Sequence, residues 1–118
     1  APKFPTYAAT MEDLYARRRE TIMSAYEAGV ALYAGSDGAG DQLHGVLPRE
    51  VLAMHRLGLP ADVVLGAASW RAREWLGHNP GLAEGDPADF VVYDTNPLDD
   101  LTVLARPAAV VLRGKVYA

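Results

Sequence analysis

Apolar residues near the start of the chain recur every three or four positions, which is the spacing of one face of a helix. Thr10 is expected to cap the start of this helix, with Asp13 three residues later in an approximate capping box. Gly29 suits the left-handed residue that follows a helix. The pattern therefore predicts a helix over residues 11–28, after an extended stretch with two prolines. The residues of the stripe are Met11, Leu14, Tyr15, Ile22, Ala25 and Tyr26.

A short apolar run follows the predicted helix at Val30–Ala34. Runs of this kind are typical of strands buried on both faces, as in a parallel sheet. The next ten residues are rich in glycine and contain Ser36, Asp37 and His44. Helix, glycine, apolar strand and glycine-rich loop in this order indicate an α/β fold.

Two more helices are predicted after the loop. Pro48 suits the first position of one helix, which Gly58 ends. Pro60 opens a second helix, which Gly77 ends. The two histidines of this region, His55 and His78, are expected to lie at the surface or to cap helix ends.

Beyond residue 78 the pattern changes to short apolar segments between turn residues. Phe90–Tyr93 predicts a strand, and Val110–Leu112 with Lys115–Tyr117 predicts a hairpin that turns at Arg113 and Gly114. A lone buried strand cannot satisfy its own backbone donors and acceptors, and a lone hairpin is marginally stable. We therefore expect both halves of the chain to complete something outside these 118 residues.

Composition narrows the class of protein. Half of the 118 residues are apolar and the formal net charge is −4, which argues against nucleic acid as a partner because phosphate binding needs a concentrated basic surface. The cluster Arg17–Arg19 is expected to form a solvated helix face. The absence of cysteine excludes disulfides and thiolate metal sites, and no apolar run approaches the roughly 18 residues of a membrane helix. We expect a cytoplasmic protein without a membrane partner.

The loop residues permit more than one interpretation. Taken alone, Ser36-Asp37-Gly38 is typical of a turn, because aspartate in such positions bonds to its own backbone. A phosphate-binding loop is disfavoured, since the segment carries two aspartates and no lysine. Ser36 lacks the histidine and acid pattern that would make it a nucleophile.

Five segments, in this order and spacing, resemble the C-terminal part of metal-dependent amidohydrolases. The branch that they resemble most contains imidazolonepropionase and prolidase-like enzymes. One departure is Ser69, which stands where the family usually has threonine. The segments are AGSDGAG, HGVLPREVLAMHRLGLP, AASWRAREWLG, GLAEGDPADFVVYDTNPLDDL and VVLRGKVY.

The resemblance implies a fold. Residues 1–78 would form the end of a (β/α)8 TIM barrel, with a helix, the last strand at Val30–Ala34, the catalytic loop and two helices. Residues 79–118 would form the C-terminal part of a small β-sandwich. The rest of the barrel would come from upstream sequence or from a partner chain, and a homo-oligomer is compatible with this assignment.

The resemblance also implies a chemistry. Asp37 follows the apolar strand, where the active sites of such barrels lie. It would be both metal ligand and general base and acid, taking a proton from a water activated by one or two divalent ions, with zinc expected. Ser36 would support the loop and His44 would contact the substrate. The sequence has no His-x-His and no two histidines four residues apart, so the remaining ligands would lie outside it and the segment alone would be inactive.

The implied function is hydrolysis of an amide, peptide or cyclic amide C–N bond in a small-molecule or dipeptide-like substrate. The alternative is a non-catalytic α/β module, or a structural subunit that completes another chain, in which Asp37 is only a turn residue. The metal content of the assembled protein distinguishes the two.

Overall fold

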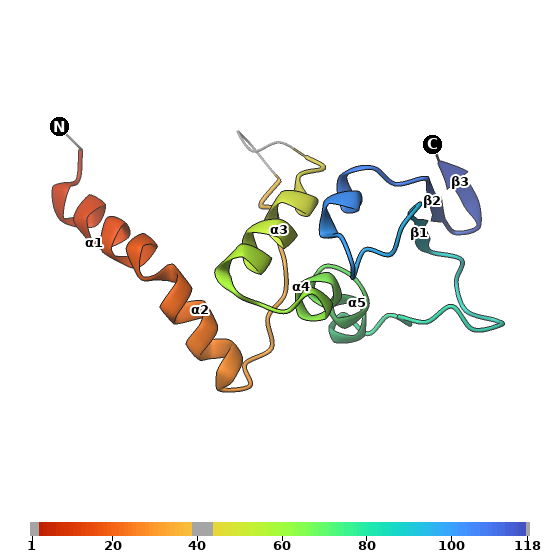
Figure 1. Ribbon diagram of the computed structural model, residues 1–118, viewed down its shortest axis with the longest axis horizontal. Coiled ribbons are helices and arrows are strands. Elements are labelled where there is room, and N and C mark those ends of the chain that lie inside the picture. Colours follow the sequence, from red (N-terminus) through yellow and green to blue (C-terminus); the bar gives the residue numbers. More distant parts are fainter. Residues whose placement is uncertain (1–2, 39–43, 118) are drawn as a thin grey trace. The chain divides into compact units, whose positions relative to one another are not determined.

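The computed structural model describes residues 3–38 and 44–117 (Figure 1). Contacts divide the chain into two compact units, Ala1–Ala31 and Leu32–Ala118. Within the described residues, the secondary structure is five α-helices, one short 3-10 helix and a three-stranded antiparallel sheet. This is a mixed α/β chain. The division at residues 78 and 79 stays a prediction.

The first unit consists of two consecutive helices, α1 (Pro5–Ala16) and α2 (Arg18–Glu27). The helix end predicted at Gly29 is confirmed, because Gly29 has φ +81° and its N–H donates to the Tyr26 carbonyl at 3.0 Å. The predicted start at Thr10 is wrong. The helix begins at Pro5, whose fixed φ and missing N–H suit a first helical turn, and the Thr10 hydroxyl donates to the Thr6 carbonyl inside the helix.

Among the described residues no strand forms over Val30–Ala34, and the predicted strand, which needs neighbours from outside these 118 residues, stays a prediction. A strand is defined by pairing, and the sheet of the described residues is built from other segments. The segment is nevertheless extended in character, because exposure alternates along residues 32–38. Its backbone is held at one point, where the Ala34 N–H donates to the Ala67 carbonyl at 3.1 Å.

The second unit contains α3 (Leu47–Leu57), α4 (Ala61–Ala67) and α5 (Trp70–Trp75). Pro48 in the first turn of α3 and Gly58 after its end (φ +120°) are confirmed. The helix predicted to run from residue 61 to 76 is broken at Ser69. The Ser69 hydroxyl donates to the Leu65 carbonyl and competes with the regular helix pattern at the break. No helix among residues 3–38 and 44–117 has the length and apolarity to span a membrane.

The core of this unit joins α3 and α4 to a short 3-10 helix, η1 (Leu101–Ala105). Asp100 caps η1, because its Oδ1 accepts from the Thr102 N–H at 2.9 Å and from the Thr102 hydroxyl at 2.6 Å. No buried polar side chain is found in the described core. The buried apolar residues are Val51, Met54, Leu59, Val63, Val64, Ala67, Leu101, Val103 and Leu104.

The sheet has the order β1-β2-β3, with β1 (Phe90–Val92), β2 (Ala109–Leu112) and β3 (Lys115–Tyr117). The predicted strand and hairpin are confirmed. Arg113 (φ +51°) and Gly114 (φ +75°) both adopt left-handed conformations, as a two-residue type I′ turn requires. This turn fixes the register that pairs Val111 with Val116.

Asp89 ties the sheet to α5. Its Oδ1 accepts from the Arg113 N–H at 2.7 Å, and its Oδ2 lies 3.4 Å from Nη2 of Arg73. Arg73 Nε also donates to the Asn79 carbonyl at 3.0 Å. One carboxylate therefore connects the hairpin turn with a helix forty residues earlier in the chain.

Leu59→Ala tests the core. Leu59 is 0% exposed, so the change should lower the free energy of unfolding by about 2–5 kcal/mol through lost burial and a cavity. Urea unfolding followed by circular dichroism measures it. Leu82→Ala is the control, because Leu82 is 67% exposed and its loss should cost less than about 0.5 kcal/mol. Equal losses in the two variants would contradict the described core.

Asp100→Asn tests the cap of η1. The Thr102 hydroxyl, and then its N–H, lower the pKa of the Asp100 carboxyl below the ordinary 3.8. Because the pKa of Asp100 is lower in the folded chain than in the unfolded chain, the ionised carboxylate adds to the free energy of unfolding. This stabilisation is complete above pH 3.8 and is lost as the pH falls through the folded pKa. The unfolding midpoint of the wild type should therefore fall more steeply with acidification than that of Asp100→Asn. Parallel pH profiles would show that the cap carries no such linkage.

Candidate functional site

Asp37 occupies a strained position in the loop after residues 30–34. Its φ of +47° lies in the left-handed region, which short polar side chains tolerate better than other non-glycine residues. The residue is exposed. No described residue donates a hydrogen bond to its carboxylate or forms an ion pair with it. Both oxygens are thus open to a ligand from outside the described residues.

Two contacts hold the segment that leads to Asp37. The Ala34 N–H donates to Ala67 at the end of α4, and the Tyr33 ring lies 5.2 Å from the Trp75 ring, centre to centre, at an interplanar angle of 32°. Trp75 ends α5, and Gly77 (φ +78°) closes that helix. The Asp37 segment is therefore attached to α4 and α5 just before the loop.

The other predicted site residues are not brought together with Asp37 by any described contact. Ser36 is half-buried next to it, and His44 is exposed. Residues 39–43 of the loop lie outside the described residues. His55 Nδ1 lies 2.8 Å from the Leu59 carbonyl beyond the end of α3, which confirms its expected helix-end role.

A metal site needs several ligands, typically four for zinc. Residues 3–38 and 44–117 contain no group of three His, Cys, Asp or Glu residues placed to hold an ion. The donor set fits a divalent ion only in part, since Asp37 can offer one carboxylate and the other ligands are not among the described side chains.

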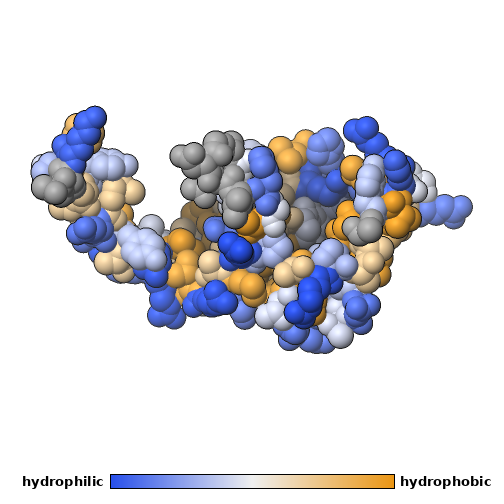
Figure 2. All heavy atoms as spheres, turned by 90° about the horizontal axis from the view of Figure 1, so that it is seen from above, coloured by the Kyte–Doolittle hydropathy of each residue, from blue (hydrophilic) through white to orange (hydrophobic). Residues whose placement is uncertain are grey.

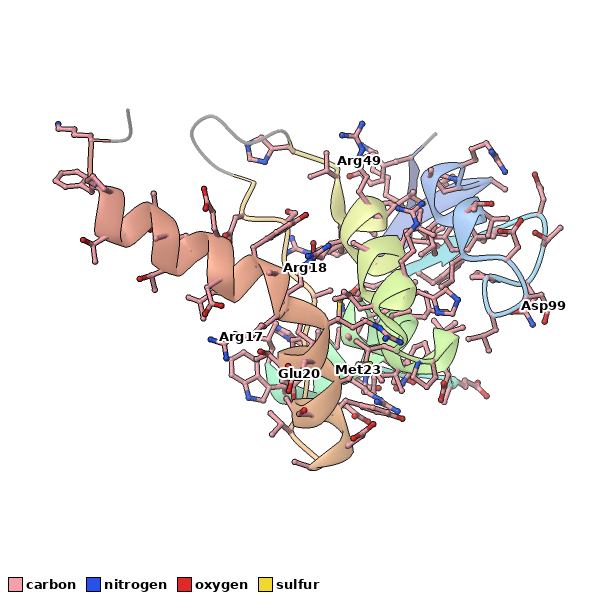
Figure 3. The ribbon with its side chains drawn as sticks, turned by 60° about the vertical axis from the view of Figure 1, so that its left-hand side comes forward. Arg17, Arg18, Glu20, Met23, Arg49 and Asp99 are labelled. Carbon is pink, nitrogen blue, oxygen red and sulfur yellow. The ribbon has the colours of Figure 1, made fainter. Side chains whose placement is uncertain are left out.

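The arginine cluster of the first unit makes local contacts. The Arg18 guanidinium lies 3.8 Å from the centre of the Tyr15 ring and donates to the Tyr15 carbonyl at 2.7 Å, while Arg17 forms an ion pair with Asp13. Arg17 and Arg18 leave the helix in different directions (Figure 3). The exposed arginines match the predicted solvated face.

Sequence reasoning missed an open, mainly apolar groove of about 1020 Å³ in the second unit. Helices α3 to α5 form one wall, where Trp70 packs across Gly66, and strands β1 and β2 form the other. Burial raises the pKa of Tyr93 in this groove above its ordinary 10.0. The edge of β1 that faces away from β2 has no partner strand among the described residues. The only sequence signal was the apolar run of β1, which does not reveal what faces it.

Large apolar side chains also remain at the surface of the second unit. Trp75, Leu76 and Leu82 each expose more than three fifths of their surface. Figure 2 shows apolar patches between the polar ones on the face that it presents. Exposed apolar surface, where it is contiguous, usually marks a place where another part of a protein binds.

Relatives of the chain are much longer than the chain itself. No protein-family model matches it. Two uncharacterized proteins, one of Mycobacterium tuberculosis strain H37Rv and one of Mycobacterium bovis, are each 45% identical to it over 117 residues. The match covers 99% of this chain and 31% of each relative, so the chain spans about a third of their length.

Solved structures give a more specific likeness. A Xaa-Pro dipeptidase with methionine bound in its active site is 30% identical with a TM-score of 0.73, over 84% of this chain and 25% of that one. A candidate prolidase of Bifidobacterium longum is 30% identical with a TM-score of 0.72, over 81% and 25%. A prolidase complexed with N-methylphosphonate-L-proline is 29% identical with a TM-score of 0.65, over 84% and 26%.

The structural neighbours are thus prolidase-like and dipeptidase-like amidohydrolase chains, of which this chain spans about a quarter. Both sequence and fold carry the likeness, because the identities lie near 30% and the TM-scores well above 0.5. The likeness predicted from the five sequence segments is confirmed at this level.

Proposed function

We propose that the chain is the part of a metal-dependent, prolidase-like hydrolase that carries Asp37. The observation that supports this most is the 30% identity and 0.73 TM-score to a Xaa-Pro dipeptidase over most of the chain. The ligands in the neighbouring structures are methionine and a phosphonate derivative of proline, which favour a dipeptide-like substrate over a cyclic amide. The proposed reaction is hydrolysis of the amide bond of a small Xaa-Pro-type dipeptide.

Asp37 is the proposed metal ligand and proton carrier. Its open carboxylate can accept the proton of the attacking water while the water oxygen bonds to the amide carbon. When the C–N bond breaks, the same carboxyl can give that proton to the leaving nitrogen. A divalent ion bound there, zinc in our proposal, would lower the pKa of water to about 7 and so make hydroxide available at neutral pH. Ser36 is proposed to support the loop, and His44 to contact the substrate.

The remaining parts of the site are proposed to come from outside these 118 residues. The curated relatives are about three times as long as the matched region, which leaves room for the other ligands and strands. The extended segment over residues 32–38 and the free edge of β1 are the places where further strands could pair. In this proposal residues 1–78 end a barrel and residues 79–118 contribute to a sandwich.

Asp37→Asn in the full-length protein tests the proton carrier. Asparagine keeps the size of the side chain and also tolerates a left-handed backbone, so the fold should persist. Loss of the proton acceptor should lower kcat for an Xaa-Pro dipeptide by at least about 100-fold. Proline release measures the rate. Asp99→Asn, a change of the same kind at another exposed aspartate, should leave it unchanged. Wild-type kcat in Asp37→Asn would end the proposed role.

Metal analysis of the full-length protein tests the cofactor. One or two divalent ions per chain are expected. The full-length protein is needed, because a single carboxylate binds such an ion weakly without ligands from the rest of the protein. Treatment with a chelator should abolish hydrolysis, and added zinc should restore it. A protein that contains no metal and hydrolyses nothing would instead support the non-catalytic module.

A further inference from the structure

We propose that Tyr33 and Trp75 are positioning residues, whose contacting rings hold Asp37 in place for proton transfer. The proposal rests on the function proposed above for Asp37. The two rings lie 5.2 Å apart in the offset range in which aromatic pairs attract each other. Neither ring belongs to the buried core, because Tyr33 is 40% and Trp75 is 68% exposed.

Trp75 lies at a helix end that hydrogen bonds hold in place. It is the last residue of α5, and the helix end is closed by the His78 N–H on the Arg73 carbonyl at 2.8 Å. Arg73, two residues before Trp75, is in turn bound to Asn79 and Asp89. The indole ring is therefore attached to a helix end that the hairpin turn also holds.

Tyr33 is attached to the loop that it would hold. Alternating exposure places Tyr33, Gly35 and Asp37 on the same side of an extended stretch. Four residues of extended chain span about 13 Å, so the Cα atoms of Tyr33 and Asp37 lie no farther apart than about that distance. Gly35, between them, adds no side chain that could fix the path.

One hydrogen bond is insufficient to fix the direction of this segment. The bond from Ala34 to Ala67 holds a single point, about which residues 35–38 could pivot. The ring contact supplies a second point, one residue away and on a different helix. Two points of attachment fix the direction of the segment. Proton transfer by Asp37 requires a fixed direction, because a displacement of about 1 Å can cost roughly 100-fold in rate.

Kinetics of full-length variants test the proposal with an Xaa-Pro dipeptide as the probe. Trp75→Ala and Tyr33→Leu should each lower kcat by about 10- to 100-fold and leave KM within about twofold. Trp75→Phe keeps a ring and should recover most of the rate. The double variant should be no slower than the worse single one, because both changes remove the same contact. Glu74→Ala is the matched control, since Glu74 is an exposed polar residue adjacent to Trp75.

Hydrogen exchange supplies a readout that does not depend on hydrolysis. The amide of Ala34 should exchange faster in Trp75→Ala, and at the wild-type rate in Glu74→Ala. Unchanged exchange, unchanged kcat, or a change in KM alone would each overturn the positioning role. Full activity of Asp37→Asn would instead overturn the proposed function, and the exchange result would still decide whether the rings hold the segment.

Discussion

The packing of η1 and α4 against α3 is the interaction on which the larger unit depends. Asp100 supports this packing, because its carboxylate accepts hydrogen bonds from the N–H and the hydroxyl of Thr102 and so caps the start of η1. Leu101 and Leu104 of that helix then share the core with α3 and α4. Because no polar side chain is buried there in the described residues, hydrophobic burial is the main term that holds these elements together. The 3-10 helix thereby connects the C-terminal sheet to the helices.

From this core, a series of specific contacts reaches the candidate site. The end of α4 supplies the carbonyl that anchors Ala34, and the end of α5 supplies the ring that contacts Tyr33. Asp89 holds α5 to the hairpin turn through Arg73. The loop that carries Asp37 is thus attached to a scaffold whose parts come from distant positions in the sequence. A loop on a fixed scaffold is the usual arrangement for a functional residue.

The same structure explains why the proposed activity belongs to a larger assembly. In the proposal Asp37 supplies one metal ligand. Among the described residues the extended segment before it has no partner strand, and an apolar groove lies open beside β1. We propose that material beyond the 118 residues completes each of these features, and the relatives have about two thirds of their length outside the matched region. Open backbone edges and exposed apolar surface therefore have one common physical explanation in the proposal, which is burial against the rest of the protein.

The sequence by itself determined the features that depend on one or two residues. Gly29, Gly58 and Gly77 ended helices because they adopt left-handed backbones at low cost, and Arg113-Gly114 specified its hairpin turn. The likeness to prolidase-like enzymes was also carried by local motifs. Tertiary structure alone decided the groove and the contact between the rings of Tyr33 and Trp75. A groove or a ring pair exists only once distant segments have packed, so neither is encoded in any single stretch of residues.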